Sequence, residues 1–139
     1  MAALGTRLLT LSLDGDEVTA QVSNCRITSG AADSDFTSFA DAAAGGAREY
    51  KLAGTATQDM AVDSVWDKIW TSAGTTIPVL IKPAGGSTAS ATQPHFTGNV
   101  TIVEPDGDLV GGEANASPTA KFTFDFEWTF SAKPTKVVA

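Results

Sequence analysis

The segment of residues 122–130 constrains the fold of this chain more than any other part of the sequence. Every even position is aromatic: Phe122, Phe124, Phe126, Trp128 and Phe130. Threonine and acidic residues stand between them. Because side chains alternate across a β-strand, the pattern predicts one strand with a buried aromatic face and a wet, charged face. We expect all five aromatic residues to lie in the core.

The rest of the chain predicts a mainly β protein. Alternating patterns indicate strands at residues 6–13, 17–28, 48–58, 76–82 and 95–104, with a tight turn at Gly15 and a bulge near Asn24. Two long polar loops are expected at residues 30–47 and 105–118, and a tail at 132–139. The predicted fold class is a β-sandwich or half-open barrel with one amphipathic α-helix packed at its edge.

The single predicted helix spans residues 60–72. Its apolar residues recur at helical spacing, and Asp59 is the expected N-cap. The stripe predicts further core residues, namely Val62, Val65, Trp66, Ile69 and Trp70.

Length and composition predict a single globular domain over residues 1–139. The net charge of −7 repels phosphate, so adhesion to nucleic acid is not expected. Cys25 is the only cysteine, which excludes an intrachain disulfide. Residues 6–13 alternate as a strand does, so the N-terminal segment is not expected to be a signal peptide, and no apolar run is long enough for a membrane span.

Few residues indicate chemistry. His95 is the only histidine, and Cys25 lies within a predicted strand, so we expect neither catalysis nor a transition-metal site. Two acidic clusters, around Gly15 and Gly107, fit ordinary turns better than the spacing of a calcium loop. The sequence predicts a structural protein that is not an enzyme and takes no metal, cofactor or small-molecule ligand.

Three segments resemble the major tail tube proteins of long-tailed, siphovirus-type bacteriophages, especially those of actinobacterial hosts. The first is the helix with Asp63, Trp66, Asp67 and Trp70, and the second is H-F-T-G-N-V-T-I at 95–102. The third is G-G-E-A-N-A-S-P-T-A-K-F-T-F-D-F-E-W at 111–128, a glycine-rich loop that runs into the aromatic strand. With the order of the elements, the resemblance covers nearly the whole chain.

The resemblance implies hexameric rings that stack into a tube, with four strands per subunit lining a channel for double-stranded DNA. It also implies assembly in the host cytoplasm, a place in the virion tail, and the tape measure protein and other tail proteins as partners.

Strand alternation then predicts which residues face the channel, and the exposed residues of the 30–47 loop are expected to contact a neighbouring subunit or ring. The predicted channel residues are Glu17, Thr19, Gln21, Ser23, Glu49, Lys51, Thr55, Thr57, Thr97, Asn99, Thr101, Thr123, Asp125, Glu127 and Thr129. The predicted contact residues are Asp33, Asp35, Phe36 and Phe39.

Two other classes of protein fit the same pattern. A tail terminator or head–tail joining protein also forms rings but need not polymerise into a tube. A soluble β-sandwich binding module would carry exposed aromatic residues on a sheet face, whereas here the aromatic residues share the apolar face.

Overall fold

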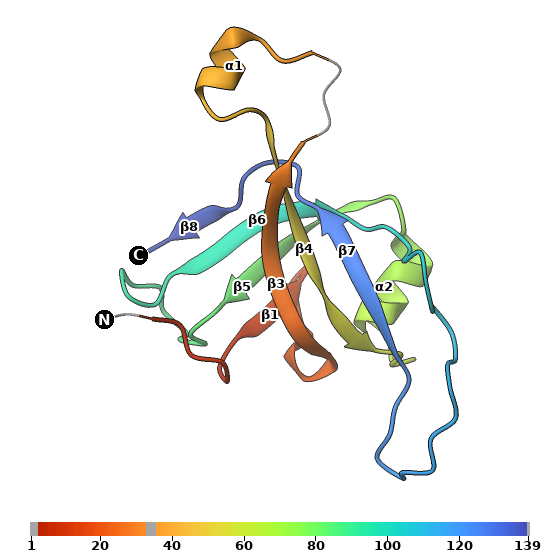
Figure 1. The fold of residues 1–139 in the computed structure, drawn as a ribbon. Coiled ribbons are helices and arrows are strands. Elements are labelled where there is room, and N and C mark those ends of the chain that lie inside the picture. The colour runs from red at the N-terminus through yellow and green to blue at the C-terminus, as the bar shows by residue number, and fades with distance from the viewer. Residues whose placement is uncertain (1–2, 33–35, 139) are drawn as a thin grey trace.

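The computed structural model describes residues 3–32 and 36–138 and is a β-sandwich with one main helix, as the sequence predicts (Figure 1). One antiparallel sheet has five strands in the order β2-β1-β5-β6-β8, and the other has three in the order β3-β4-β7. The strands are β1 Thr10–Leu13, β2 Asp16–Glu17, β3 Val22–Ala31, β4 Arg48–Thr57, β5 Thr76–Lys82, β6 His95–Thr101, β7 Thr123–Thr129 and β8 Thr135–Val137. The helices are α1 Phe39–Ala43 and α2 Val65–Ser72.

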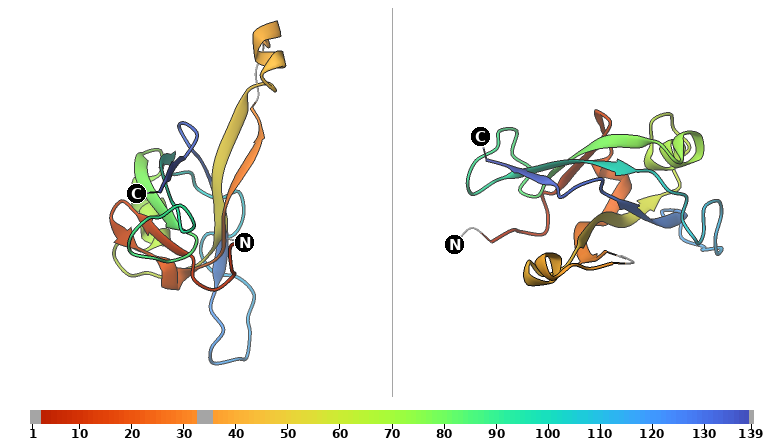
Figure 2. Two further views of the ribbon diagram at one scale, coloured as in Figure 1. Left: turned by 90° about the vertical axis from the view of Figure 1, so that its left-hand side faces the viewer. Right: turned by 90° about the horizontal axis from the view of Figure 1, so that it is seen from above.

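The two sheets lie against each other as two layers (Figure 2). Their apolar faces meet in one core between them. Strand alternation places a polar residue between successive core residues, so the two polar faces point to opposite outer sides of the sandwich. The five-stranded sheet buries Leu11, Leu13, Ile77, Val79, Ile81 and Val100, and the three-stranded sheet buries Leu52, Ala56, Phe124, Phe126 and Trp128.

The aromatic strand forms as predicted, with one exception. Phe124, Phe126, Trp128 and Phe130 are buried, whereas Phe122 is 48% exposed. Phe122 precedes the first residue of β7, where the chain enters from the long loop, so it does not lie over the sandwich core.

Helix α2 begins five residues later than predicted, because residues 61–64 form a turn and Asp63 has a φ of 64°. Its N-cap is Ser64, not Asp59: the Ser64 hydroxyl accepts a hydrogen bond from the Asp67 amide at 3.1 Å. The turn rotates Val62 outward, where it is 83% exposed.

The predicted apolar stripe of α2 is therefore only partly buried. Val65 and Ile69 lie in the core, and Trp66 is half-buried against it. Trp70 is 58% exposed, because it stacks on the flank of Trp66 instead of pointing between the sheets. The prediction that Val62 and Trp70 belong to the core is wrong.

Residues 17–28 do not form one strand. After β2 a 3-10 turn covers Thr19–Gln21, and β3 follows in the other sheet. The Val18 amide donates to the Leu11 carbonyl at 2.9 Å, which ties this crossover to β1. The predicted bulge is confirmed, since the pairing of β3 with β4 shifts between Ser23 and Arg26 and Asn24 has a φ of 52°.

The predicted 30–47 loop begins two residues later than expected, after Ala31, and contains a short helix. Strands β3 and β4 extend beyond the sandwich as an arm, and α1 lies at its tip (Figure 1). The Ser38 hydroxyl caps α1 by accepting from the Asp41 amide at 3.0 Å. The predicted contact residues Asp33 and Asp35 lie outside the described residues.

The C-terminal segment also differs from the prediction. Within residues 132–139, expected to be a tail, β8 pairs antiparallel with β6 and extends the five-stranded sheet. The 105–118 loop contains no helix or strand, as predicted.

Candidate functional site

The outer surface of the three-stranded sheet is wet and polar across its strands, and we call it the polar face. Lys51 Nζ and Glu127 Oε1 lie 2.9 Å apart, and the Thr55 hydroxyl donates to Asp125 Oδ1 at 2.7 Å. Register places Thr57 opposite Thr123, so the polar positions of β4 and β7 lie side by side. The predicted channel residues that share this face are Glu49, Lys51, Thr55, Thr57, Thr123, Asp125, Glu127 and Thr129.

Strand β3 completes the polar face. Ser23, a predicted channel residue, pairs with Thr55, and after the bulge Arg26 pairs with Ala53 and Thr28 with Lys51. Arg26 and Thr28 were not among the predicted channel residues. The signal was present in the sequence: a bulge at Asn24 reverses the alternation, and this puts Arg26 and Thr28 on the polar side.

Three predicted channel residues lie on another surface. Thr97, Asn99 and Thr101 belong to β6 and therefore to the five-stranded sheet, whose polar face points away from that of the three-stranded sheet. The prediction that four strands share one lining face is wrong, because the sheet that carries the polar face contains three strands.

The predicted channel residues that precede β3 do not lie on the polar face either. Glu17 lies in β2, and the Thr19 hydroxyl accepts from the Leu11 amide at 3.1 Å. The Gln21 side chain accepts from the Val65 amide at 2.9 Å, so it supports the start of α2. All three belong to the crossover region and not to the polar face.

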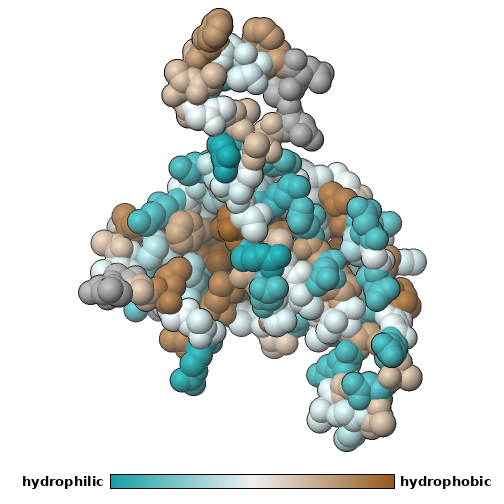
Figure 3. Space-filling model, in the orientation of Figure 1, coloured by the Kyte–Doolittle hydropathy of each residue, from teal (hydrophilic) through white to brown (hydrophobic). Residues whose placement is uncertain are grey.

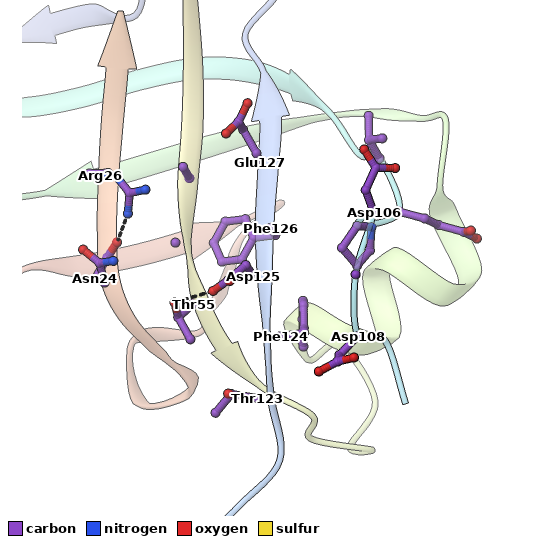
Figure 4. A pocket seen from close by; sticks show the side chains of 16 residues that line it. Asn24, Arg26, Thr55, Asp106, Asp108, Thr123, Phe124, Asp125, Phe126 and Glu127 are labelled. Atoms are coloured by element: carbon purple, nitrogen blue, oxygen red, sulfur yellow. Dashed lines mark hydrogen bonds between the residues drawn. The ribbon is translucent and has the colours of Figure 1, made fainter. Parts of the chain in front are cut away.

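A hollow of about 700 Å³ runs across the polar face from β3 to residues 103–108 (Figure 4). Its carboxylates come from Asp125 and Glu127 on β7 and from Glu104, Asp106 and Asp108 on the adjoining segment; Arg26 lies on the opposite side. Most of the charge in this hollow is therefore negative. Among the described residues no group of carboxylate, histidine and cysteine side chains is arranged to hold a metal ion.

Both outer strands of the three-stranded sheet are edges. Strand β4 lies in the middle, so among the described strands the ten-residue β3 and the seven-residue β7 each pair on one side only. The free side of an edge strand presents backbone donors and acceptors that another strand can pair with. The polar face is thus bordered on both sides by strands that are able to extend it.

The single histidine and the single cysteine lie away from the polar face. His95 is buried, and its Nε2 lies 2.8 Å from the Gly86 carbonyl oxygen. Cys25 is directed toward the apolar side of β3, where desolvation raises the pKa of its thiol to about 11 despite the nearby Arg26.

One acidic residue near Gly15 is held in an ion pair. Asp16 accepts an ion-paired hydrogen bond from Lys68 at 2.9 Å, and Lys68 is itself buried. This pair fastens α2 to the β1–β2 hairpin.

The predicted contact residues Phe36 and Phe39 lie on the arm. Phe39 is 97% exposed at the first position of α1, and Phe36 is 79% exposed. They therefore lie on a projecting surface, away from the polar face.

No helix in residues 3–32 or 36–138 is long and apolar enough to cross a membrane. A comparison with models of known protein families and a comparison with curated proteins both found no match to this chain.

Proposed function

We propose that this chain is the structural subunit of the tail tube of a long-tailed bacteriophage. In this proposal, copies join through β3 and β7 into hexameric rings, and the rings stack. The polar face lines the channel through which double-stranded DNA passes. The chain resides in the virion tail after assembly in the host cytoplasm, with the tape measure protein and other tail proteins as partners.

One observation carries the proposal: the three-stranded sheet buries its apolar face, keeps its other face polar, and has two open edges. Joining these three-stranded sheets edge to edge around a ring pairs both of their open edges and leaves a continuous polar inner wall. A head-to-tail contact of this kind closes into a ring when the rotation between neighbours allows it.

The dimensions support a channel. Three strands from each of six subunits, spaced by about 4.8 Å and tilted by about 40°, give a backbone diameter of about 36 Å. This diameter is in the range that a duplex requires after side chains are added to the wall. The estimate is smaller than a four-stranded lining would give at the same tilt.

The chemistry of the wall supports passage without adhesion. Carboxylates and hydroxyls predominate, and Lys51 is held against Glu127. Binding of DNA depends on cations that replace the counterions of phosphate, so an acidic wall gains little from contact with the duplex.

The arm supports contact between rings. It projects beyond the sandwich along the direction of β3 and β4, and Phe39 at its tip is almost completely exposed (Figure 1). An exposed aromatic residue on a projecting element is typical of an interaction surface.

Light scattering and negative-stain electron microscopy of the purified chain test the proposal. We expect concentration-dependent assembly into hollow tubes, together with slower hydrogen exchange of the β3 amides that face away from β4. Single rings that never stack would favour a tail terminator or joining protein. A chain that stays monomeric at millimolar concentration and physiological salt would overturn the proposal.

A further inference from the structure

The sandwich is open along the β3 side. There an apolar cleft of about 380 Å³ lies between the two sheets. Figure 3 shows the corresponding brown hollow beside β3, below the arm. The residues that line the cleft include Leu9, Cys25, Ile27, Tyr50, Ile81 and Phe96.

The cleft exists because β3 directs apolar residues inward where the facing sheet does not cover them. After the bulge, Ile27 pairs with Leu52 and shares its apolar side. Cys25 and Ile27 pack against the core, yet both remain only partly buried. The raised pKa of Cys25, caused by desolvation, agrees with an apolar wall at this point.

The opposite side of the sandwich is closed by α2 and carries an exposed aromatic ridge. The rings of Trp66 and Trp70 stack with centroids 5.3 Å apart and planes 10° from parallel. Trp66 is fixed by its Nε1, which donates to the Leu109 carbonyl at 2.8 Å. Trp70 is therefore a supported aromatic side chain with more than half of its surface exposed.

The two sides also carry opposite charge. Arg26 and Lys133 border the cleft. Beside α2, the segment that holds Trp66 carries Glu104, Asp106 and Asp108, and residues 83–120 contain no lysine or arginine. A basic side and an acidic side on the same chain favour a head-to-tail contact between copies over a symmetric one.

We propose that Trp70 of one subunit seats in the apolar cleft of the next copy in the ring. This inference rests on the proposed function, because pairing of β7 with a neighbour's β3 brings the α2 side of one copy against the open side of the next. The contact would bury an exposed tryptophan, fill the cleft and bring the acidic 104–108 segment toward Arg26 and Lys133. Tryptophan in a desolvated pocket is a frequent centre of binding energy.

Site-specific photo-cross-linking tests the contact directly. The full chain carrying Trp70→p-benzoylphenylalanine is irradiated under assembly conditions, and cross-linked peptides are identified by mass spectrometry. We expect intermolecular cross-links to peptides that contain Cys25, Ile27, Ile81 or Phe96. The matched probe Phe122→p-benzoylphenylalanine has similar exposure but lies beside β7, so it should not label the peptides that contain Ile81 or Phe96.

A second probe separates the possible occupants of the cleft. If Phe39→p-benzoylphenylalanine labels the cleft peptides and the probe at Trp70 does not, the arm is the occupant and the proposal is wrong. An apolar small molecule that co-purifies with the assembled chain and blocks labelling from Trp70 would overturn it as well.

Assembly measurements distinguish this inference from the proposed function. Trp70→Ala should weaken association at least about 10-fold, as loss of a central interface tryptophan does, while Trp70→Phe should retain most of it. Tubes that form equally well with Trp70→Ala would refute the cleft contact and leave the tube intact. Cleft cross-links in open oligomers without rings would support the contact and refute the tube, and a monomeric wild-type chain would refute both.

Discussion

Trp128 is the largest side chain that the core encloses completely, and its position explains why the aromatic run is decisive for the fold. Its indole Nε1 donates to the Val103 carbonyl at 3.1 Å, and its ring packs 4.8 Å from that of Phe126. One residue thus joins β7 to the segment that follows β6 and fills the space between the sheets.

Replacing Trp128 with alanine should destabilise the fold by about 3–5 kcal/mol, because it leaves a cavity and an unpaired Val103 carbonyl. Phe122→Ala is the matched control from the same aromatic run, and its exposure predicts a loss of about 1 kcal/mol or less. Urea unfolding measures both. Equal losses for the two variants would contradict the assignment of Trp128 to the core centre.

Cys25 should react slowly with alkylating reagents in the folded chain. Its pKa is about 11 instead of 9.0, so below pH 9 the thiolate fraction is about 100-fold lower than in the unfolded chain. The alkylation rate should rise about tenfold per pH unit from pH 8 toward 10. A rate in native conditions equal to that in urea would contradict the burial of this thiol.

The same raised pKa links Cys25 to stability. The folded-state pKa lies above the unfolded value, so the neutral Cys25 thiol contributes to the free energy of unfolding. This contribution is fully present below about pH 9 and is lost as pH rises through about 11. Comparison with Cys25→Ala separates this loss from that of other groups that titrate in the same range.

At the scale of elements, both helices begin with a serine N-cap, one of them buried and the other exposed. Ser64 is buried, accepts from the Asp67 amide at 3.1 Å and donates to the Asp59 carbonyl at 2.6 Å. Ser38 makes the same kind of cap on α1, at the exposed tip of the arm.

Ser64→Ala should therefore cost about 1–2 kcal/mol in the free energy of unfolding, since it removes both a cap and a buried hydrogen bond. Ser38→Ala should stay within about 0.5 kcal/mol of the wild-type value, because α1 contributes no buried residue to the core. A larger loss for Ser38→Ala than for Ser64→Ala would show that the arm contributes to the global fold.

The sequence predicts those elements that are determined by the residues within them, and it misses those that depend on contacts with distant segments. Strict alternation predicted β4, β5 and β7, and the break at Cys25 and Ile27 predicted the bulge. The 3-10 turn at Thr19–Gln21 was missed because its cause is tertiary: hydrogen bonds to Leu11 and Val65 hold it. Strand β8 was missed for the same reason, since its three residues are a strand only beside β6.

Membership of the polar face was predictable for the residues of β4 and β7, whereas the residues of β6 were wrongly assigned to it. Alternation shows that Thr97 and Asn99 point away from the core, yet it does not show which sheet carries them. Membership of a sheet is set by pairing over long sequence separation. On α2, helical spacing could not foresee that Trp70 stacks on Trp66 and remains outside the core.

At the scale of the whole molecule, the acids of β7 should serve the channel and not the fold. Asp125 and Glu127 are exposed, and their partners Thr55 and Lys51 are also on the polar face. Exposed pairs of this kind contribute about 0–1 kcal/mol each. The double variant Asp125→Lys with Glu127→Lys should therefore fold and assemble into tubes.

The same variant should make the wall adhesive to DNA. Each phosphate that the new lysines neutralise should steepen the log–log dependence of binding on salt by about one unit. DNA bound within a tube should be protected from nuclease. The control variant, Thr97→Lys with Asn99→Lys, adds cations to the five-stranded sheet, outside the proposed channel. DNA bound to this variant should therefore be digested by nuclease. If DNA were protected only with the control variant, the five-stranded sheet and not the polar face would line the channel.

Cryo-electron microscopy of the assembled particle would show directly which surface lines the channel. We expect a hollow tube whose inner wall is the polar face, with Asp125 and Glu127 pointing into the channel and β3 of each subunit paired with β7 of its neighbour. A tube whose inner wall carries Thr97, Asn99 and Thr101 would contradict this expectation, as would a particle without a channel.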